Sequence, residues 1–254
     1  MTGAGRTALV TGGAKRIGRA IVEDLVAHGF SVAIHCNRSR DEAESLAAEV
    51  RSSGGQAQVV AADLTIIGEV AQLIARAEKV LGPVSLLVNN ASAFEDDSLE
   101  DLDFEKWENH FALHLKAPVL LSSRFAAALP GGTEGLIVNI IDQRVWKLTP
   151  RHFSYTLSKS ALWAATRSMA QALAPNIRVN ALGPGPTLAN ERQEEKDFQA
   201  QIDGLLLERG PALQEFGAAV RYLWEARSVT GQMIALDGGQ HLAWRTPDVT
   251  GIVE

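Results

Sequence analysis

Seven short aliphatic or β-branched runs alternate along this chain with longer segments that have a helical period. The runs are apolar almost throughout, which is typical of strands buried on both faces of a parallel sheet. We predict strands at Thr7–Thr11, Ser31–Cys36, Gln56–Ala62, Val84–Asn89, Gly135–Ile141, Ile177–Leu182 and Gln232–Leu236. The alternation predicts an α/β fold in which a doubly wound parallel sheet is covered by helices on both faces.

The segments between these runs carry apolar residues at helical spacing. Two of them end at glycines that suit a helix C-terminus, Gly29 and Gly82. We predict helices at Ile17–His28, Asp41–Arg51, Glu69–Leu81, Phe104–Leu129, Tyr155–Ala174 and Ala212–Ala226. The chain has 254 residues, of which 46% are hydrophobic, so we expect one sizeable core and a single domain over residues 1–254.

Residues 186–211 interrupt the alternation after the sixth predicted strand. This stretch becomes strongly polar in NERQEEKDFQ and then reaches three consecutive leucines, Leu205 to Leu207. It follows the carboxyl end of a strand, and that edge of an open α/β sheet faces the ligand crevice. We therefore predict a partly helical insertion that covers a substrate. A solvated helix with one buried stripe is the alternative.

Charge and composition exclude several classes of partner. The net charge of -6 gives no global positive field for a nucleic-acid backbone. Cys36 is the single cysteine, so an intrachain disulfide and a paired-cysteine zinc site are excluded, and we predict no metal site. No apolar stretch resembles a signal segment or approaches the ~18 residues of a membrane span. We expect a cytoplasmic protein that binds neither nucleic acid nor membrane.

The stretch TGGAKRIG, Thr11 to Gly18, lies between the first predicted strand and the first predicted helix. Glycines permit a tight turn there, and the first N–H groups of the helix are available to a pyrophosphate. An ordinary turn is the alternative, because the spacing GxGxxG is not literally present. We predict a dinucleotide site whose residues here are Gly12, Lys15, Arg16 and Ile17.

The end of the second predicted strand indicates which dinucleotide binds. Proteins that bind NAD usually place an acidic residue there to hold the ribose hydroxyls, but this chain has Asn37, Arg38 and Ser39. A guanidinium and a hydroxyl bind a 2′-phosphate through charge-assisted hydrogen bonds, whereas an acid repels it. We therefore predict that the cofactor is NADPH.

Tyr155 and Lys159 stand four residues apart in YTLSK, so a helix places both side chains on one face. A phenol is a poor acid–base group at neutral pH unless a nearby cation favours its phenolate. Lys159 is predicted to supply that cation. A pair on a solvated helix surface is the alternative reading of this spacing.

Several ordered motifs together resemble the short-chain dehydrogenase/reductase family, which has a Rossmann fold. They are TGGAKRIG, the Asp63-Leu64 pair, NNAS at Asn89 to Ser92, YTLSK and RVNALGPGP, and they extend from Thr7 to about Gly239. The resemblance implies nicotinamide chemistry with Tyr155 as the proton donor or acceptor, and a homotetramer built through the two longest predicted helices. The cofactor residues that it implies are Asp63, Leu64, Asn89, Asn90, Ala91, Lys159, Pro184, Gly185 and Thr187.

Departures from the common pattern of that family narrow the resemblance. The family usually has glycine at Arg16, serine at Asp142 and asparagine near His114, and its NNAG is here NNAS followed by Ala93 and Phe94. These positions resemble the pteridine reductases and the dihydrofolate or dihydromonapterin reductases within the family. The substrate residues implied are Arg16, Ser92, Phe94, Asp142 and Tyr155, with catalysis by Asp142, Tyr155 and Lys159.

A physical argument favours the same substrates. A ketone develops negative charge on oxygen as it is reduced, which an ionised Asp142 would oppose. A C=N bond takes a proton on nitrogen instead, and Asp142 with Tyr155 suits that transfer. We predict reduction of a pteridine or dihydrofolate. The alternative functions are a carbonyl reductase and a dinucleotide sensor without catalysis. Single residues also have structural alternatives: Asp142 as the cap of a turn, Phe94 as a core residue, and His114 as a buried structural histidine.

Overall fold

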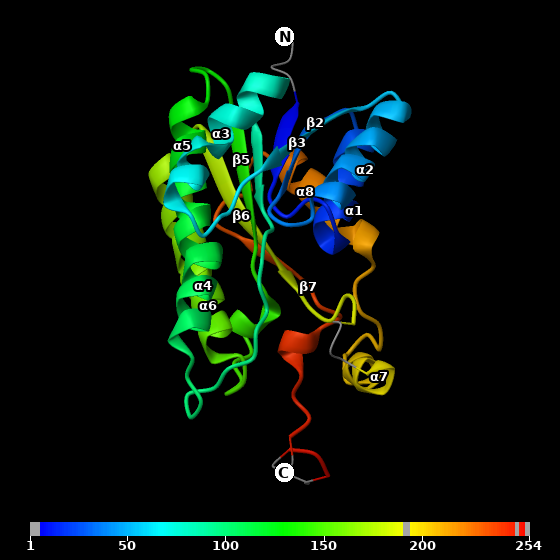
Figure 1. The fold of residues 1–254 in the computed structure, drawn as a ribbon. Coiled ribbons are helices and arrows are strands. Elements are labelled where there is room, and N and C mark those ends of the chain that lie inside the picture. The colour runs from blue at the N-terminus through cyan, green and yellow to red at the C-terminus, as the bar shows by residue number, and fades with distance from the viewer. Residues whose placement is uncertain (1–5, 190–193, 247–248, 252–254) are drawn as a thin grey trace.

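The computed structural model describes residues 6–189, 194–246 and 249–251, and its centre is a sheet of seven parallel strands (Figure 1). The strand order is β3-β2-β1-β4-β5-β6-β7, so the predicted doubly wound sheet is confirmed. The strands are β1 (Thr7–Val10), β2 (Ser31–Cys36), β3 (Gln56–Ala61), β4 (Leu86–Asn89), β5 (Gly135–Ile140), β6 (Ile177–Pro184) and β7 (Met233–Leu236).

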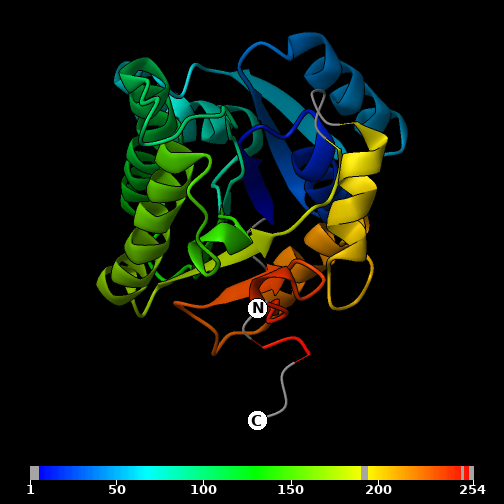
Figure 2. The ribbon, with the colours of Figure 1, turned by 90° about the horizontal axis from the view of Figure 1, so that it is seen from below.

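Helices cover both faces of this sheet, as the view along the strands shows (Figure 2). One face packs on α1 (Arg16–Ala27), α2 (Arg40–Ser52) and α8 (Leu213–Glu225). The other packs on α3 (Ile67–Leu81), α5 (Ala117–Ala128) and α6 (Phe153–Leu173), and α4 (Phe104–Phe111) lies against α6. Strands β1, β4 and β5 are buried along their whole length, which explains why their sequences are apolar throughout.

The helix predicted over Phe104–Leu129 is interrupted. A π-helical turn, Ala112–Lys116, separates α4 from α5, and Pro118 lies in the first turn of α5. A proline has no N–H group to donate to a carbonyl one turn earlier, so the regular hydrogen bonds cannot continue through it. The sequence predicted the extent of this segment but not its break.

The carboxyl ends of the strands meet at one edge of the sheet, where the chain order reverses between β1 and β4. Open α/β sheets bind ligands at such a switch point. Helix α7 (Glu195–Asp203) of the predicted insertion lies beyond this edge (Figure 1). Its Phe198 and Ile202 are half-buried and Leu205 just after it is buried, so the alternative reading of a solvated helix with one buried stripe is not contradicted. The first residues of the polar stretch, 190–193, lie outside the described residues.

No helix among the described residues is long and apolar enough to cross a membrane. In the same part of the chain, no three histidine, cysteine or acidic side chains gather in a way that could hold a metal ion.

Candidate functional site

The turn after β1 has the shape that the glycines predicted. Gly12 adopts a left-handed conformation with φ of 59°, which glycine tolerates best. A side chain at Gly18 would come within 2.1 Å of the Gly12 carbonyl oxygen, so only glycine fits where the helix meets the turn. No side chain caps the first turn of α1, and its N–H groups are thus available to an anion.

Two side chains hold this turn in place through hydrogen bonds to its backbone. Asn90 donates from Nδ2 to the carbonyls of Thr11 (2.9 Å) and Gly12 (3.0 Å). His35 in β2 accepts the Gly12 amide at Nδ1 (3.1 Å), so its proton is on Nε2 and is donated to the Ala62 carbonyl (3.1 Å). Burial lowers the pKa of His35 to about 4 and keeps it neutral. Sequence analysis missed His35, although a histidine inside an apolar strand signals a buried hydrogen-bonding role.

The two cations of TGGAKRIG have different partners. Lys15 forms an ion pair with Glu42 of α2, with 2.5 Å between Nζ and Oε1. Arg16 has a left-handed backbone with φ of 51°, and its guanidinium donates to the carbonyls of Leu188 (3.1 Å) and Ala189 (3.2 Å). Arg16 therefore joins the glycine turn to the start of the insertion.

The residues predicted to select the cofactor follow the carboxyl end of β2, and Asp63 follows the neighbouring β3. Asn37 and Arg38 are exposed, and Ser39 is half-buried just before α2. Hydrogen bonds from Thr65, and then Asn37 and the charge of Arg38, lower the pKa of Asp63. Asp63 is thus ionised and lies beside the residues predicted to bind a phosphate.

The remaining predicted cofactor residues lie along the same edge. Asn89 is buried and donates to Asn139 of β5 (2.8 Å), while its own Oδ1 has no hydrogen-bond partner among the described residues. Gly185 passes so close to Asp237 that a side chain would not fit. The other members of this set are half-buried or buried at the strand ends: Ile17, Leu64, Ala91, Pro184 and Thr187.

Tyr155, Asp142 and Lys159 come together as predicted, at the end of β5 and on α6. The Tyr155 hydroxyl donates to Oδ2 of Asp142 (3.0 Å), and Lys159 donates to the Ile140 carbonyl (2.8 Å). The other oxygen of Asp142 accepts the Arg144 amide (2.8 Å) and caps a short 3-10 turn, so the turn-cap reading is confirmed, and the same carboxylate also contacts Tyr155.

The electrostatics of this cluster differ from the expectation that Lys159 favours a phenolate. Burial, and then the negative charge of Asp142, raise the pKa of Tyr155 well above its ordinary value. Burial raises the pKa of Asp142 and lowers that of Lys159 to about 8. The Lys159 ammonium lies 5.7 Å from the centre of the phenol ring. Tyr155 is therefore a protonated group that can donate.

Phe94 and Ser92 follow β4 and reach the same cluster. Phe94 is 40% exposed, which rules out the core reading. Its ring stacks on His152 at 4.2 Å and meets the Tyr155 ring edge-on at 4.8 Å. The Ser92 hydroxyl lies 3.0 Å from Nε2 of His114, which is buried and hydrogen-bonded, as one reading of that residue predicted. Predicted substrate residues from two other segments, Phe94 after β4 and Asp142 after β5, thus contact Tyr155, whereas Arg16 bonds the start of the insertion instead.

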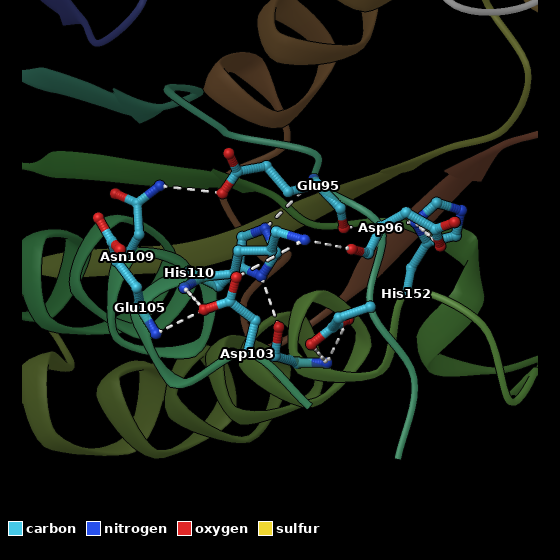
Figure 3. A network of polar contacts seen from close by, with 10 residues as sticks. Glu95, Asp96, Asp103, Glu105, Asn109, His110 and His152 are labelled. Atoms are coloured by element: carbon cyan, nitrogen blue, oxygen red, sulfur yellow. Dashed lines mark hydrogen bonds and ion pairs between the residues drawn. The ribbon is translucent and has the colours of Figure 1, made fainter. Parts of the chain in front are cut away.

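The loop that carries Phe94 is fixed by polar contacts on both sides (Figure 3). The Glu95 amide donates to His110 (3.4 Å), and the Glu95 carbonyl lies 3.4 Å from Nδ1 of His152. Lys106 donates to the Asp96 carbonyl (3.0 Å), and Asp103 accepts the Glu105 amide at the start of α4 (2.9 Å). Sequence analysis missed His110, whose spacing of four residues from His114 was the available signal.

A seven-stranded parallel sheet, a glycine turn after β1 and a buried tyrosine–lysine pair define the class of doubly wound α/β proteins that bind dinucleotides. The family model described as short chain dehydrogenase matches residues 6–200. The chain belongs to this family, as its motifs predicted.

Relatives within the family agree with the narrower resemblance. A crystal structure of FolM alternative dihydrofolate reductase 1 from Brucella suis in complex with NADP is 62% identical, with a TM-score of 0.94 over 96% of this chain and 98% of that chain. Dihydromonapterin reductase from Klebsiella pneumoniae subsp. pneumoniae is 36% identical over 51% of this chain and 55% of that protein. The chain thus spans about half the length of the curated relatives that it matches.

Proposed function

We propose that this protein uses NADPH to reduce a ring C=N bond of a pteridine or dihydrofolate, with Tyr155 as the proton donor. The hydrogen bond of 3.0 Å between Tyr155 and Asp142 is the main support for this proposal. It places a carboxyl group beside the phenol, whereas a carbonyl reductase needs a neutral hydrogen-bond donor at that position to stabilise the oxyanion. The names of the similar proteins from Brucella suis and Klebsiella pneumoniae support the same substrates.

The geometry of the sheet edge fits NADPH. The uncapped first turn of α1 and the Gly12 turn suit the pyrophosphate, and Asn37, Arg38 and Ser39 suit the 2′-phosphate. The solved structure from Brucella suis, which contains NADP, supports this choice. The other residues proposed to line the cofactor are Lys15, Arg16, Ile17, Asp63, Leu64, Asn89, Asn90, Ala91, Lys159, Pro184, Gly185 and Thr187.

The chemistry divides between cofactor and protein. NADPH supplies a hydride to the carbon of the C=N bond when it is bound. Tyr155 gives its hydroxyl proton to the ring nitrogen, so one O–H bond breaks and one N–H bond forms. Asp142 orients the phenol through its hydrogen bond, and the positive charge of Lys159 stabilises the phenolate that remains until water returns a proton.

Ser92, Phe94 and Arg16 are proposed to bind the pterin. The Phe94 ring is 40% exposed next to Tyr155, with one face stacked on His152 and Arg144 5.7 Å from its centre. Stacking of a pterin on its exposed part would contribute about 0.5 to 1.5 kcal/mol beyond area burial. Arg16 has further N–H donors besides the two that bond Leu188 and Ala189. The bonds of Arg16 to Leu188 and Ala189 connect the glycine turn to the start of the insertion, and they support our proposal that residues 186–211 form a flap over the substrate.

We further propose a homotetramer in the cytoplasm. The assembly is supported by apolar side chains that remain exposed in a single chain, among them Val119 on α5, and Leu242 and Trp244 near the C-terminus. Val119 lies in the segment predicted as the helix Phe104–Leu129, one of the two helices through which the resemblance described above implies assembly.

The test measures NADPH oxidation with a panel of dihydropteridines, dihydrofolate and simple ketones. The proposal expects turnover of at least one pterin and little or none of the ketones. Turnover of ketones alone would make the protein a carbonyl reductase, and turnover of nothing despite tight NADPH binding would make it a sensor. Arg38→Asp should remove the preference for NADPH over NADH, and equal binding of both by the wild type would contradict the cofactor assignment.

A further inference from the structure

Two histidines form a repeated arrangement behind the catalytic tyrosine. His110 near the end of α4 and His114 in the π-helical turn are both fully buried, with ring centres 5.4 Å apart and planes 15° apart. Each ring also meets the Tyr155 ring edge-on, at 5.8 and 5.2 Å. The π turn interrupts the regular helix at this point, and such turns frequently mark functional sites.

Each histidine bridges α6 to the loop after β4. Nδ1 of His114 lies 2.9 Å from the Ser158 hydroxyl, and its Nε2 accepts the Ala93 amide at 3.2 Å. Nδ1 of His110 lies 2.7 Å from the Ser154 hydroxyl, and its Nε2 accepts the Glu95 amide at 3.4 Å (Figure 3). Helix α6 also carries Tyr155, so the two bridges connect the loop to the catalytic helix.

The backbone amides determine the tautomer of both rings. An N–H group donates only to a nitrogen with a free lone pair, so Nε2 of each ring carries no proton. The proton of a neutral ring is therefore on Nδ1, which donates to serine. The Ser158 hydroxyl then donates onward to the Tyr155 carbonyl (2.7 Å), so each polar group in this chain of bonds has a partner.

The two bonds hold the backbone on both sides of Phe94. Ala93 and Glu95, the residues on either side of Phe94, are held by His114 and His110. The Phe94 ring lies in contact with the Tyr155 ring. Loss of either bond would free the backbone on one side of Phe94.

We propose that His110 and His114 are positioning residues, which as neutral Nδ1–H tautomers hold residues 92–95 in the shape that presents Ser92 and Phe94 to the substrate. This inference rests on the proposed function only in taking these two side chains to face the substrate. Neither histidine transfers a proton in it.

The proposal also determines the direction of the hydrogen bond between Ser92 and His114. Because Nε2 of His114 has only a lone pair to offer, the Ser92 hydroxyl donates to it at 3.0 Å, whereas its other acceptor, the Ala93 carbonyl, is 3.4 Å away. The Ser92 side chain also lies within hydrogen-bond reach of Tyr155, so one of its lone pairs faces Tyr155 and the other accepts a hydrogen bond from a ligand. Ser92 therefore favours a substrate group that donates, such as an amino or ring N–H group, over one that only accepts.

Burial, assisted by nearby positive charge, lowers the pKa of both rings and keeps them neutral. Burial, and then Lys159 and His110, lower the pKa of His114 well below the ordinary histidine value. Burial lowers the pKa of His110, opposed by Glu95 and Asp97 and assisted by His152 and Lys159. A proton added at Nε2 would face a backbone N–H group, so the KM for the pterin should rise only in acid, below the ordinary histidine range.

The test separates the two nitrogens of His114. His114→Gln places an acceptor oxygen near the Nε2 position, whereas His114→Asn reaches only to the Nδ1 position and leaves the Ala93 amide without a partner. An unpaired, partly buried donor corresponds to about a 10-fold effect, so His114→Asn should raise the KM for a dihydropterin by about that factor. His114→Gln should stay within about threefold of wild type. Both should bind NADPH as wild type does.

Two readouts do not depend on turnover. Hydrogen exchange of residues 92–96 should accelerate in His114→Asn but not in His114→Gln, and ¹⁵N spectra of labelled histidine should show the proton on Nδ1. The exposed His28 provides matched Asn and Gln controls, and the same pair of variants at His110 repeats the test through the Glu95 amide.

A proton on Nε2, or equal exchange rates and equal KM values in the Asn and Gln variants, would overturn the positioning role. If wild type reduces no pterin, the exchange and ¹⁵N results still decide the role of the histidines, while the proposed function alone fails.

Discussion

The carboxylate of Asp142 uses its two oxygens differently. One oxygen caps a short turn through the Arg144 amide, and the other accepts the Tyr155 hydroxyl. Burial raises the pKa of both acidic groups, so a proton is held between them at neutral pH rather than released to water. This arrangement suits a substrate nitrogen that must gain a proton.

Replacing Asp142 by serine, the usual residue of the family, tests this arrangement. Asp142→Ser should lower kcat/KM for a pterin about 10- to 100-fold, because the phenol loses its charged partner, while NADPH affinity stays close to wild type. Tyr155→Phe should lower the same step further, since it removes the proton donor. Steady-state kinetics and cofactor titration provide the measurements. An unchanged kcat/KM in Asp142→Ser would reduce Asp142 to a turn cap.

Lys159 should determine the alkaline limit of activity. Burial lowers its pKa to about 8, so the ammonium loses its proton as pH rises through that value, and stabilisation of the phenolate is lost with it. The kcat of wild type should therefore fall above pH about 8. Lys159→Arg keeps its charge at every accessible pH and should lack this decline, even if its kcat is lower throughout. A decline at the same pH in both proteins would assign it to another group.

At the scale of the elements, much of the fold could be predicted from sequence because the signals are local. The apolar runs of β1, β2 and β5 matched the observed strands within a residue, and so did the ends of α1 and α2. The π turn between α4 and α5 could not be predicted, because it depends on Pro118 together with packing against α6. That turn places His114, so its role was also the least predictable.

The candidate site divides in the same way. Tyr155, Lys159 and Asp142 were predicted from spacing and family resemblance, and the structure brings them together. The partners of Arg16 could not be predicted, because Leu188 and Ala189 are about 170 residues distant in sequence. His35 was missed for the same reason, since its partner Gly12 belongs to a different strand–helix unit.

His35 of β2 should make stability sensitive to acid. The unfolded chain binds its proton below pH about 6.5, whereas the folded protein binds it only below about 4, so stability is fully present above pH 6.5 and falls towards pH 4. The difference corresponds to roughly 3 kcal/mol. His35→Asn retains an acceptor for the Gly12 amide but cannot be protonated, and its stability should fall less over this range.

Urea unfolding at pH 7 and pH 4.5 measures this effect. His28→Asn, at an exposed histidine, controls for the loss of a histidine elsewhere. The same loss of stability in His35→Asn as in wild type would show that other groups cause the acid sensitivity.

At the scale of the whole molecule, the sheet brings the functional segments to one edge. The glycine turn follows β1, Asn90 to Phe94 follow β4, Asp142 follows β5 and the insertion follows β6. The opposite edge carries none of the proposed site residues. The residues proposed for the cofactor follow β1 to β4 and β6, those proposed for the substrate follow β1, β4 and β5 and include Tyr155 on α6, and Arg16 belongs to both sets and bonds to the start of the insertion.

The outer surfaces of helices α4, α5 and α6 lie away from the sheet edge that carries the proposed site, and they are where we propose that copies of the chain pair. If α4 to α6 pair between copies of the chain, a charge in the middle of that surface should separate them, because it would be buried without a partner. Val119→Glu on α5, where Val119 is 40% exposed, should convert a tetramer into smaller species. Val80→Glu on α3, where Val80 is 48% exposed, is the matched control outside the proposed contact.

Light scattering should give about four times the 27.3 kDa of one chain for wild type and the control. An active wild-type monomer would contradict the assembly while leaving the catalytic assignments intact, because every residue in them belongs to one chain.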